Sequence, residues 1–133
     1  MKLLTQEMLA KFEKINKMSM MEKESYDRNP EVIAKFFHPW FGWTWFATEY
    51  DPKTRCFFGF VTGVGRPEDD EWGYFSLDEL DDLKIHGCPT ERDLYFGNPH
   101  ISDVKEIKKI EGFHKAREEG PKDVGRRNPK HYK

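Results

Sequence analysis

The chain has 133 residues, of which 35% are charged, 37% apolar and 15% aromatic, and its formal net charge is −2. This length fits one domain, and no apolar run approaches the ~20 residues that a membrane-spanning helix needs. The two cysteines, Cys56 and Cys88, lack the spacing of a disulfide framework. The N-terminus becomes acidic too early for a signal peptide. We therefore expect a cytoplasmic protein with no membrane partner.

The first predicted element is a helix that begins after Thr5, a residue type that caps helices. Apolar residues follow it at helical spacing and fade between residues 21 and 25. Asn29-Pro30 is a second helix-start signal. The apolar run at 32–37 fits either a short helix or a buried strand, and Pro39 ends the element in both cases.

The clearest prediction is an aromatic β-hairpin. Residues 43–50 alternate in the way that is typical of a strand, and their composition is rich in Trp, Phe and Thr. Residues 51–54 predict a turn, and residues 55–61 form the returning strand. Both faces of this hairpin carry aromatic side chains, so we expect both faces to be covered.

Shorter elements follow the hairpin. Residues 72–75 predict a third strand, and Ser76 with Glu79 predicts a capped helix. Residues 91–96 predict a fourth short strand. Ser102 is expected to cap a last helix that runs to residue 110.

Together these elements predict an α+β fold, in which a small antiparallel sheet is centred on the aromatic hairpin and flanked by short helices. We place the globular domain at residues 1–112. Residues 113–133 are rich in charge and poor in apolar side chains, and we expect them to form a flexible basic C-terminal tail.

Charge is distributed unevenly along the chain. Residues 64–83 hold eight acids and one base, whereas residues 120–133 hold five bases and one acid. Such asymmetry indicates either two solvated segments or two binding surfaces.

Three strings are distinctive: KFFHPWFGWTWFATE at 35–49, EWGYFSLDEL at 71–80 and ERDLYF at 91–96. In this order and spacing they resemble a family of small bacterial, plasmid and phage proteins whose shared domain has no assigned function. The resemblance covers residues 1 to about 104 and implies a mobile-element setting. It brings no established catalytic residues. The chain departs from the family pattern in its acidic residues 68–71 and its long basic tail.

Motifs for catalysis or cofactor binding are not found. His86, Cys88 and His100 could supply zinc ligands, but the spacing of structural zinc sites is missing, so we expect no metal and no cofactor. Cys56 lies in the apolar strand, and Cys88 has no recognisable activating base. The chain contains no phosphate loop, dinucleotide fingerprint or nucleophile elbow.

Two other groups have competing interpretations. Arg92 and Asp93 either bind an anion or form an internal ion pair, and pairing is the better interpretation. The aromatic residues at 40–46 form either a core or a stacking platform for single-stranded nucleic acid, and the few neighbouring bases favour a core. Trp40 and Phe41, next to Pro39, are the aromatics expected to be exposed.

The leading hypothesis is a non-enzymatic protein that binds a host or phage protein complex with a basic groove. Its most concrete form is an inhibitor of a nucleic-acid-dependent defence complex, because arrayed carboxylates can occupy a groove built for phosphates. The predicted partner-binding residues are Glu68, Asp69, Asp70, Glu71, Asp78, Asp82, Trp40 and Phe41.

Two alternatives stand beside it. The first is a protein that associates with nucleic acid through its tail and its exposed aromatics. The tail residues in question are Lys122, Arg126, Arg127 and Lys130. The second, ranked last because no motif supports it, is an enzyme whose site is assembled from scattered residues such as His38, Arg92 and Asp93.

Overall fold

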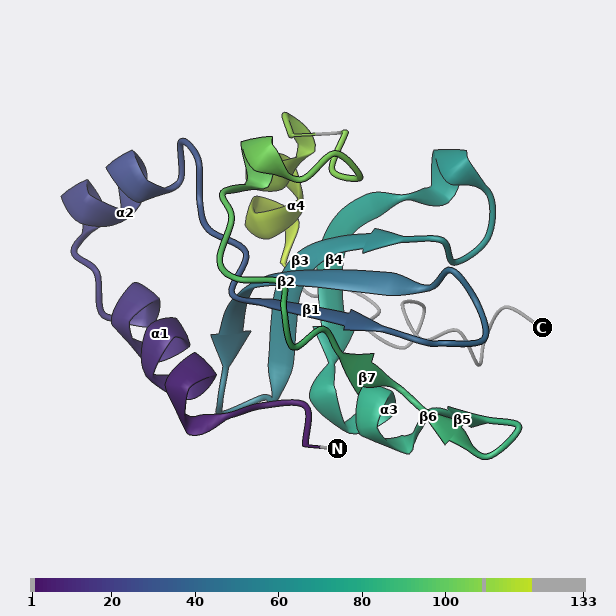
Figure 1. Cartoon of the computed structure of the whole chain (residues 1–133). Helices are drawn as coiled ribbons and strands as arrows, with labels where there is room; N and C mark the ends of the chain where they lie inside the picture. The colour runs from purple at the N-terminus through teal and green to yellow at the C-terminus, as the bar shows by residue number, and fades with distance from the viewer. Residues whose placement is uncertain (1, 109, 121–133) are drawn as a thin grey trace.

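A five-stranded antiparallel sheet forms the centre of the computed structural model, which describes residues 2–108 and 110–120 (Figure 1). Its strand order is β4-β3-β2-β1-β7. The strands are β1 (Ala34–Phe37), β2 (Thr44–Asp51), β3 (Cys56–Thr62), β4 (Glu71–Ser76) and β7 (Glu91–Arg92). The predicted α+β class, with a small antiparallel sheet around the aromatic hairpin, is confirmed.

The hairpin β2–β3 is the longest pairing of the sheet. Phe46 lies opposite Phe60, and the register shifts between Ala47 and Glu49. At this bulge the buried Thr48 hydroxyl donates a hydrogen bond to the Phe58 carbonyl over 3.1 Å. The bulge keeps the aromatic side chains on their faces while the strand bends.

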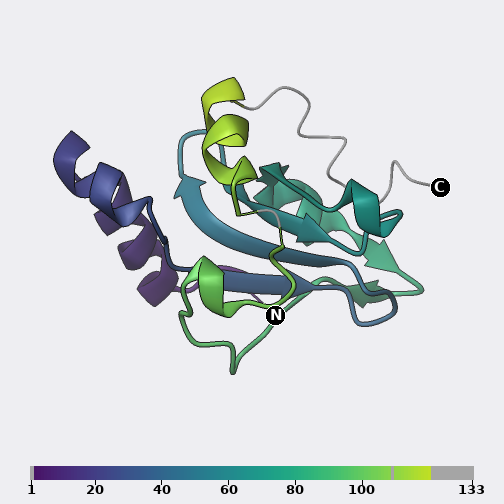
Figure 2. The ribbon, with the colours of Figure 1, turned by 90° about the horizontal axis from the view of Figure 1, so that it is seen from above.

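Each face of the sheet is covered by a separate apolar core, as the two-sided aromatic pattern predicts. Trp45, Phe36 and Phe57 point to the face that α1 (Gln6–Asn16) and α3 (Leu77–Asp82) cover. Phe46 and Phe58 point to the face that α4 (Gly112–Glu119) and the 3-10 turn η2 (Ile101–Asp103) cover. Figure 2 shows α1 and α4 flanking the sheet.

The N-terminal helical region differs from its prediction. The Thr5 hydroxyl caps α1 by accepting a hydrogen bond from the Met8 amide over 3.1 Å, as predicted. However, α1 ends at Asn16, and a second helix, α2 (Met20–Tyr26), occupies the stretch where the pattern was expected to fade. This helix forms because Ser19 and Glu22 cap each other's backbone amides.

The helix start predicted at Asn29-Pro30 is wrong, and the strand interpretation of residues 32–37 is the one that β1 confirms. The Asn29 side chain bonds instead to Ser102, with its amide nitrogen 2.8 Å from the Ser102 hydroxyl. Ser102 lies in the single 3-10 turn η2. The prediction of a helix that runs from Ser102 to residue 110 is therefore wrong.

The helix after the third strand is confirmed as α3, whose cap Ser76 accepts a hydrogen bond from the Glu79 amide over 3.3 Å. It is followed by a small hairpin of β5 (Lys84–Ile85) and β6 (Cys88–Pro89). The hairpin turns at His86 and Gly87, both with positive φ. The strand expected at 91–96 is shorter, because β7 ends at Arg92.

The folded part of the chain extends beyond the boundary expected at residue 112. Phe113 in α4 is 1% exposed and packs edge-on against Trp72 and Phe58 at 5.1 and 5.3 Å. The basic tail residues lie outside the described residues. None of the helices in residues 2–108 and 110–120 is long and apolar enough to cross a membrane.

Candidate functional site

Three connections gather at one end of the sheet, which we call the loop end. They are the β1–β2 loop at 38–43, the β3–β4 loop at 63–70, which contains the 3-10 turn η1 (Pro67–Asp69), and the β5–β6 turn at 86–87 (Figure 1). Thr44 lies opposite both Phe37 and Thr62, so the first two loops leave neighbouring strands side by side. A Cβ atom on Gly63 would lie 2.0 Å from the Gly42 carbonyl oxygen, so the two loop backbones touch.

His38 organises the first of these loops from a buried position. Its Nδ1 accepts a hydrogen bond from the Trp40 amide over 3.2 Å, so the proton is carried by Nε2, which donates to the Cys88 carbonyl over 3.0 Å. Nδ1 thus shapes the loop and Nε2 joins it to β6, so both ring nitrogens of His38 are engaged within the fold.

Trp40 and Phe41 are held in place although they face solvent. Their exposed fractions are 57% and 42%, which confirms the exposure expected for them. The Trp40 indole N–H donates to the Cys88 Sγ over 2.8 Å, and its ring lies 4.9 Å from the His86 ring. Phe41 stacks on Trp43 at 4.4 Å and an interplanar angle of 16°. The exposed rings are therefore oriented by their neighbours.

A groove of about 600 Å³ lies beside the Phe41 ring. It is lined by Phe37 and Thr44 from the sheet and by Pro39 and Phe41 from the β1–β2 loop. Leu94 and Tyr95, which follow β7 and are 58% and 94% exposed, also line it. Tyr95 is thus more exposed than either predicted aromatic, and it was missed because residues 91–96 were expected to form a strand.

The acidic partner-binding residues fall into two groups. Glu68, Asp69, Asp70 and Glu71 belong to the loop end, whereas Asp78 and Asp82 belong to α3, which begins after the other end of β4 (Figure 1). The six residues of β4 separate the groups by roughly 17–20 Å along the strand. They do not form one continuous acidic surface.

Several of these carboxylates form hydrogen bonds or ion pairs within the domain. Asp69 accepts a hydrogen bond from the Arg66 amide and Asp70 accepts one from the Gly63 amide, both over 3.1 Å, so they shape their own loop. Asp78 pairs with Arg55 at 2.8 Å. Glu68, Glu71 and Asp82 are exposed.

Arg92 and Asp93 both have partners within the chain, and Asp93 takes part in an internal ion pair with Lys35. Arg92 donates to the carbonyl oxygens of Lys2 and Leu3 and so ties down the N-terminus. Asp93 lies 3.7 Å from the Lys35 ammonium, and its other oxygen accepts from the Tyr95 amide over 3.0 Å.

The described residues contain no group of three His, Cys, Asp or Glu side chains arranged to hold a metal ion. Cys88 is half-buried against Trp40. His100 lies elsewhere, where its backbone forms an isolated antiparallel β-bridge with Glu31. Cys56 is half-buried and its thiol points to the Thr54 carbonyl at 3.6 Å.

A second cluster of functional-looking side chains was not predicted from the sequence. Lys23 from α2 lies 2.7 Å from Asp27 and 2.9 Å from Glu49 on β2, and Arg117 from α4 pairs with the same two carboxylates. Burial alone raises the pKa of Asp27, but the hydrogen bonds of Arg117 and Lys23 outweigh it and hold the pKa below its ordinary value of 3.8. We call these four residues the ion-pair cluster; their charges balance.

No curated protein and no solved structure is significantly similar to this chain. One family model matches residues 3–112, which span the sheet, the loop end and everything up to the start of α4. It is described as "Protein of unknown function (DUF2958)", in agreement with the resemblance that the three distinctive strings show. The chain belongs to this family.

Proposed function

We propose that this domain is a non-enzymatic protein-binding module and that the loop end is its binding surface. The observation that carries the proposal is the exposure of Trp40 and Phe41 in the β1–β2 loop and of Tyr95, which lines one groove with Phe41, in a domain that buries Trp45 and Trp72. Exposed apolar patches of this kind are retained at interaction sites, and Trp and Tyr supply much of the binding energy in protein interfaces.

The charges beside these rings favour a protein partner over nucleic acid. A platform that stacks bases also needs a basic groove for the phosphates. Here the neighbouring loop carries Glu68, Asp69, Asp70 and Glu71 against Arg66 alone. The two cations of the groove, Lys35 and Arg92, are engaged by intramolecular contacts.

The charge of the loop end selects a partner with Lys and Arg beside an apolar surface, since complementary potentials speed encounter and set specificity. In the mobile-element setting that the resemblance implies, a nucleic-acid-dependent defence complex of the host fits this description. The proposal confines the acidic contribution to residues 68–71, because Asp78 and Asp82 lie on α3. It assigns no role to a membrane or a cofactor.

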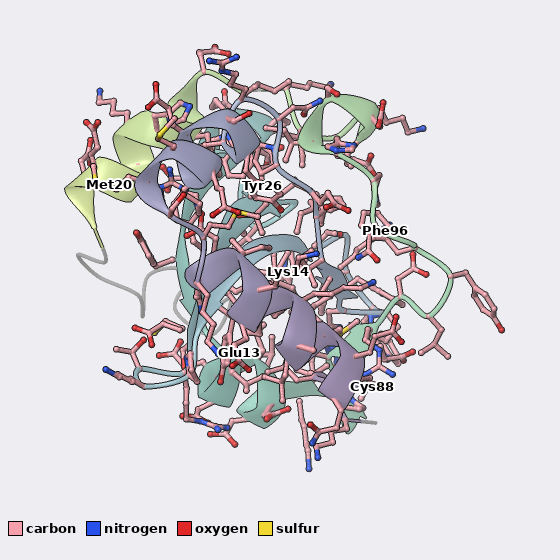
Figure 3. All side chains as sticks on the ribbon, turned by 90° about the vertical axis from the view of Figure 1, so that its left-hand side faces the viewer. Glu13, Lys14, Met20, Tyr26, Cys88 and Phe96 are labelled. Carbon is pink, nitrogen blue, oxygen red and sulfur yellow. The ribbon has the colours of Figure 1, made fainter. Side chains whose placement is uncertain are left out.

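The test is capture of proteins from a bacterial lysate treated with nuclease, with the full chain as bait. The variant Trp40→Ala/Phe41→Ala removes exposed apolar side chains at the loop end. The matched control Met20→Ala/Met21→Ala removes two from α2, where they are 90% and 83% exposed. Figure 3 shows Met20 on the opposite side of the molecule from Cys88, the contact of Trp40.

We expect the loop-end variant to lose the captured partner and the α2 variant to keep it, with both variants melting cooperatively. Equal capture by the two variants would exclude the loop end as the binding surface. A second pair, Glu68→Gln/Glu71→Gln against Asp82→Asn, tests the acidic part. Affinity and its salt sensitivity should fall only in the first of these, because screening acts on exposed charges.

A further inference from the structure

His38 is a buried titratable residue that the proposed function does not use, and it is 1% exposed. Its Nδ1 accepts a hydrogen bond from the Trp40 amide over 3.2 Å, and its Nε2 donates one to the Cys88 carbonyl over 3.0 Å. The first bond spans two residues and closes the tip of the β1–β2 loop, whereas the second joins the loop to β6. The loop is therefore built around the neutral ring, with the proton on Nε2.

A second proton on this ring affects the two hydrogen bonds in opposite ways. Both nitrogens of a protonated histidine are donors, so Nδ1–H then faces the Trp40 N–H, and two donors do not bond. The bond from Nε2 to the Cys88 carbonyl persists and becomes charge-assisted, which strengthens it. Protonation therefore releases the tip of the loop while the ring stays anchored to β6.

The base of the loop does not depend on the charge of the ring. The His38 amide donates to the Trp43 carbonyl over 3.0 Å, and neither of these main-chain groups titrates. The rings of Phe41 and Trp43 each lie 5.8 Å from the His38 ring. An aromatic ring attracts a cation at such a distance, so the protonated ring keeps favourable contacts. The change is thus confined to Trp40 and the residues beside it.

The charged groups around His38 leave its own charge free to change. Two cations and two anions line the same groove as His38, namely Lys35, Arg92, Glu91 and Asp93. Near the β5–β6 hairpin, the Cys88 thiol accepts from the Trp40 indole, and the His86 ring lies 4.9 Å from the Trp40 ring. His86 is therefore a second titratable group in contact with Trp40, and a test has to separate the two histidines.

We propose that His38 is a pH-sensitive switch that controls how Trp40 is presented at the loop end. The neutral ring holds the Trp40 amide and with it the orientation of the exposed side chains, and the protonated ring releases both. This inference rests on the proposed function and adds its regulation. Histidine side chains ordinarily change charge between about pH 8 and about pH 5, so binding at the loop end weakens as pH falls through this range. His38 acts through Trp40 and is a positioning residue.

The experiment follows the free full chain by NMR between about pH 8 and about pH 5, and reads the shifts of the Trp40 backbone amide and of the His38 ring. His38→Asn is the variant that does not titrate, because an Asn side-chain oxygen accepts from the amide two residues on, as Nδ1 does here. His86→Asn is the matched control. It removes the other histidine at Trp40, suits the φ of 53° at that position, and creates an Asn-Gly pair, which hairpin turns favour.

We expect the Trp40 amide to titrate with the midpoint of the His38 ring in wild type and in His86→Asn, and to stay constant in His38→Asn. Capture from nuclease-treated lysate should follow the same order. One pH unit below the midpoint about a tenth of the molecules keeps the neutral ring, so the apparent affinity for the captured partner should fall about tenfold. His38→Asn should show no such fall.

Three results would overturn the inference. They are a His38 ring that stays neutral down to about pH 5, a Trp40 amide that does not follow the ring, and wild-type capture that weakens in acid no more than capture by His38→Asn. If His38→Asn does not fold, the comparison of ring and amide in wild type and in His86→Asn decides alone. The NMR measurement needs no partner, so its failure would leave the proposed function standing wherever capture at neutral pH depends on Trp40 and Phe41.

Discussion

The ion-pair cluster holds charges away from water, whereas the loop end holds aromatic rings in water, and each arrangement is energetically unfavourable by itself. In the cluster, charges are taken out of water, and every one of them is paired: Asp27, 6% exposed, contacts both Lys23 and Arg117, and so does Glu49. At the loop end, large aromatic rings are left in water although the sheet buries similar rings a few residues away. The cluster has its partners within the chain, whereas the rings of the loop end are oriented but uncovered.

The difference separates groups that hold the fold from groups that are available to a partner. A buried charge persists only with a partner, because its desolvation is otherwise too costly. The cluster therefore explains how α2, β2 and α4 are held together. An exposed ring contributes less to folding than a buried one, since much of its surface stays in water, and for Tyr95 this is 94%. Substitutions in the two regions should consequently separate stability from binding.

The largest effect on stability is expected from Phe113→Ala, which tests whether α4 belongs to the domain. Phe113 is buried between Trp72 and Phe58. Its truncation leaves a cavity in the core and should lower the free energy of unfolding by about 3–5 kcal/mol. Tyr95→Ala is the matched aromatic truncation at the loop end and should change it by less than about 0.5 kcal/mol.

Chemical denaturation of both variants measures the contrast. An unchanged midpoint for Phe113→Ala would mean that α4 does not pack on the sheet in solution, and that the domain ends near residue 112 after all. A large loss for Tyr95→Ala would mean that this ring is part of the core, and the loop end would lose its main exposed group.

A smaller effect is expected from Arg117→Ala. This change leaves Asp27 and Glu49 to share Lys23 alone, so one carboxylate loses most of its compensation. Because the Arg117 side chain is still 24% exposed, we expect a loss of about 2–3 kcal/mol, below the value for a fully buried pair. Arg117→Lys restores the charge without the planar fork and should recover part of the loss.

Thermal unfolding of wild type, Arg117→Ala and Arg117→Lys provides the measurement. Lysate capture by the Arg117→Ala protein below its melting temperature should equal that of wild type, because the cluster and the loop end share no residues. Loss of capture in the folded variant would show that the two regions are coupled and that their assumed division is wrong.

The sequence predicted the elements whose signals are local. Trp45 and Phe46 alternate within one strand, and Ser76 caps α3 with the residue three positions ahead, so neither depends on distant contacts. The second helix was missed although its signal was also local, since Ser19 and Glu22 have the spacing of a capping box. The apolar pattern by itself does not indicate this helix, because its periodicity fades between residues 21 and 25.

The two regions compared above could not be predicted in the same way. Asp27 and Arg117 are 90 residues apart, and each belongs to a segment that reads as solvated surface. Trp40 and Phe41 were predicted to be exposed because Pro39 places them in a loop. The groove also includes Tyr95, which is exposed because β7 ends at Arg92 and Tyr95 lies outside the sheet. The split of the acidic residues likewise depends on the direction of β4.

The smallest expected effect is a pH dependence that belongs to the cluster alone. Hydrogen bonds and charges hold the folded-state pKa of Asp27 below its ordinary value of 3.8, which the unfolded chain retains. The stabilisation from Asp27 is therefore complete above that value and is lost as pH falls through the folded-state pKa. Each unit of lowering corresponds to about 1.4 kcal/mol. Asp27→Asn has the shape of the protonated residue, so the gap in melting temperature between wild type and this variant should be widest near neutral pH and close in acid.

Melting curves of the two proteins between about pH 7 and about pH 3 test this, because the range spans the ordinary pKa of the carboxyl group. Other shifted carboxylates are present in both proteins and cancel in the difference: the pKa of Glu13 is lowered by Lys17, that of Glu22 by its hydrogen bonds to Ser19, and that of Asp81 is raised by burial. A gap that stays constant with pH would mean that Asp27 acts through its shape and hydrogen bonds rather than its charge. The charges of the ion-pair cluster would then contribute little to the stability of the fold. The cluster would differ less from the loop end than we argue.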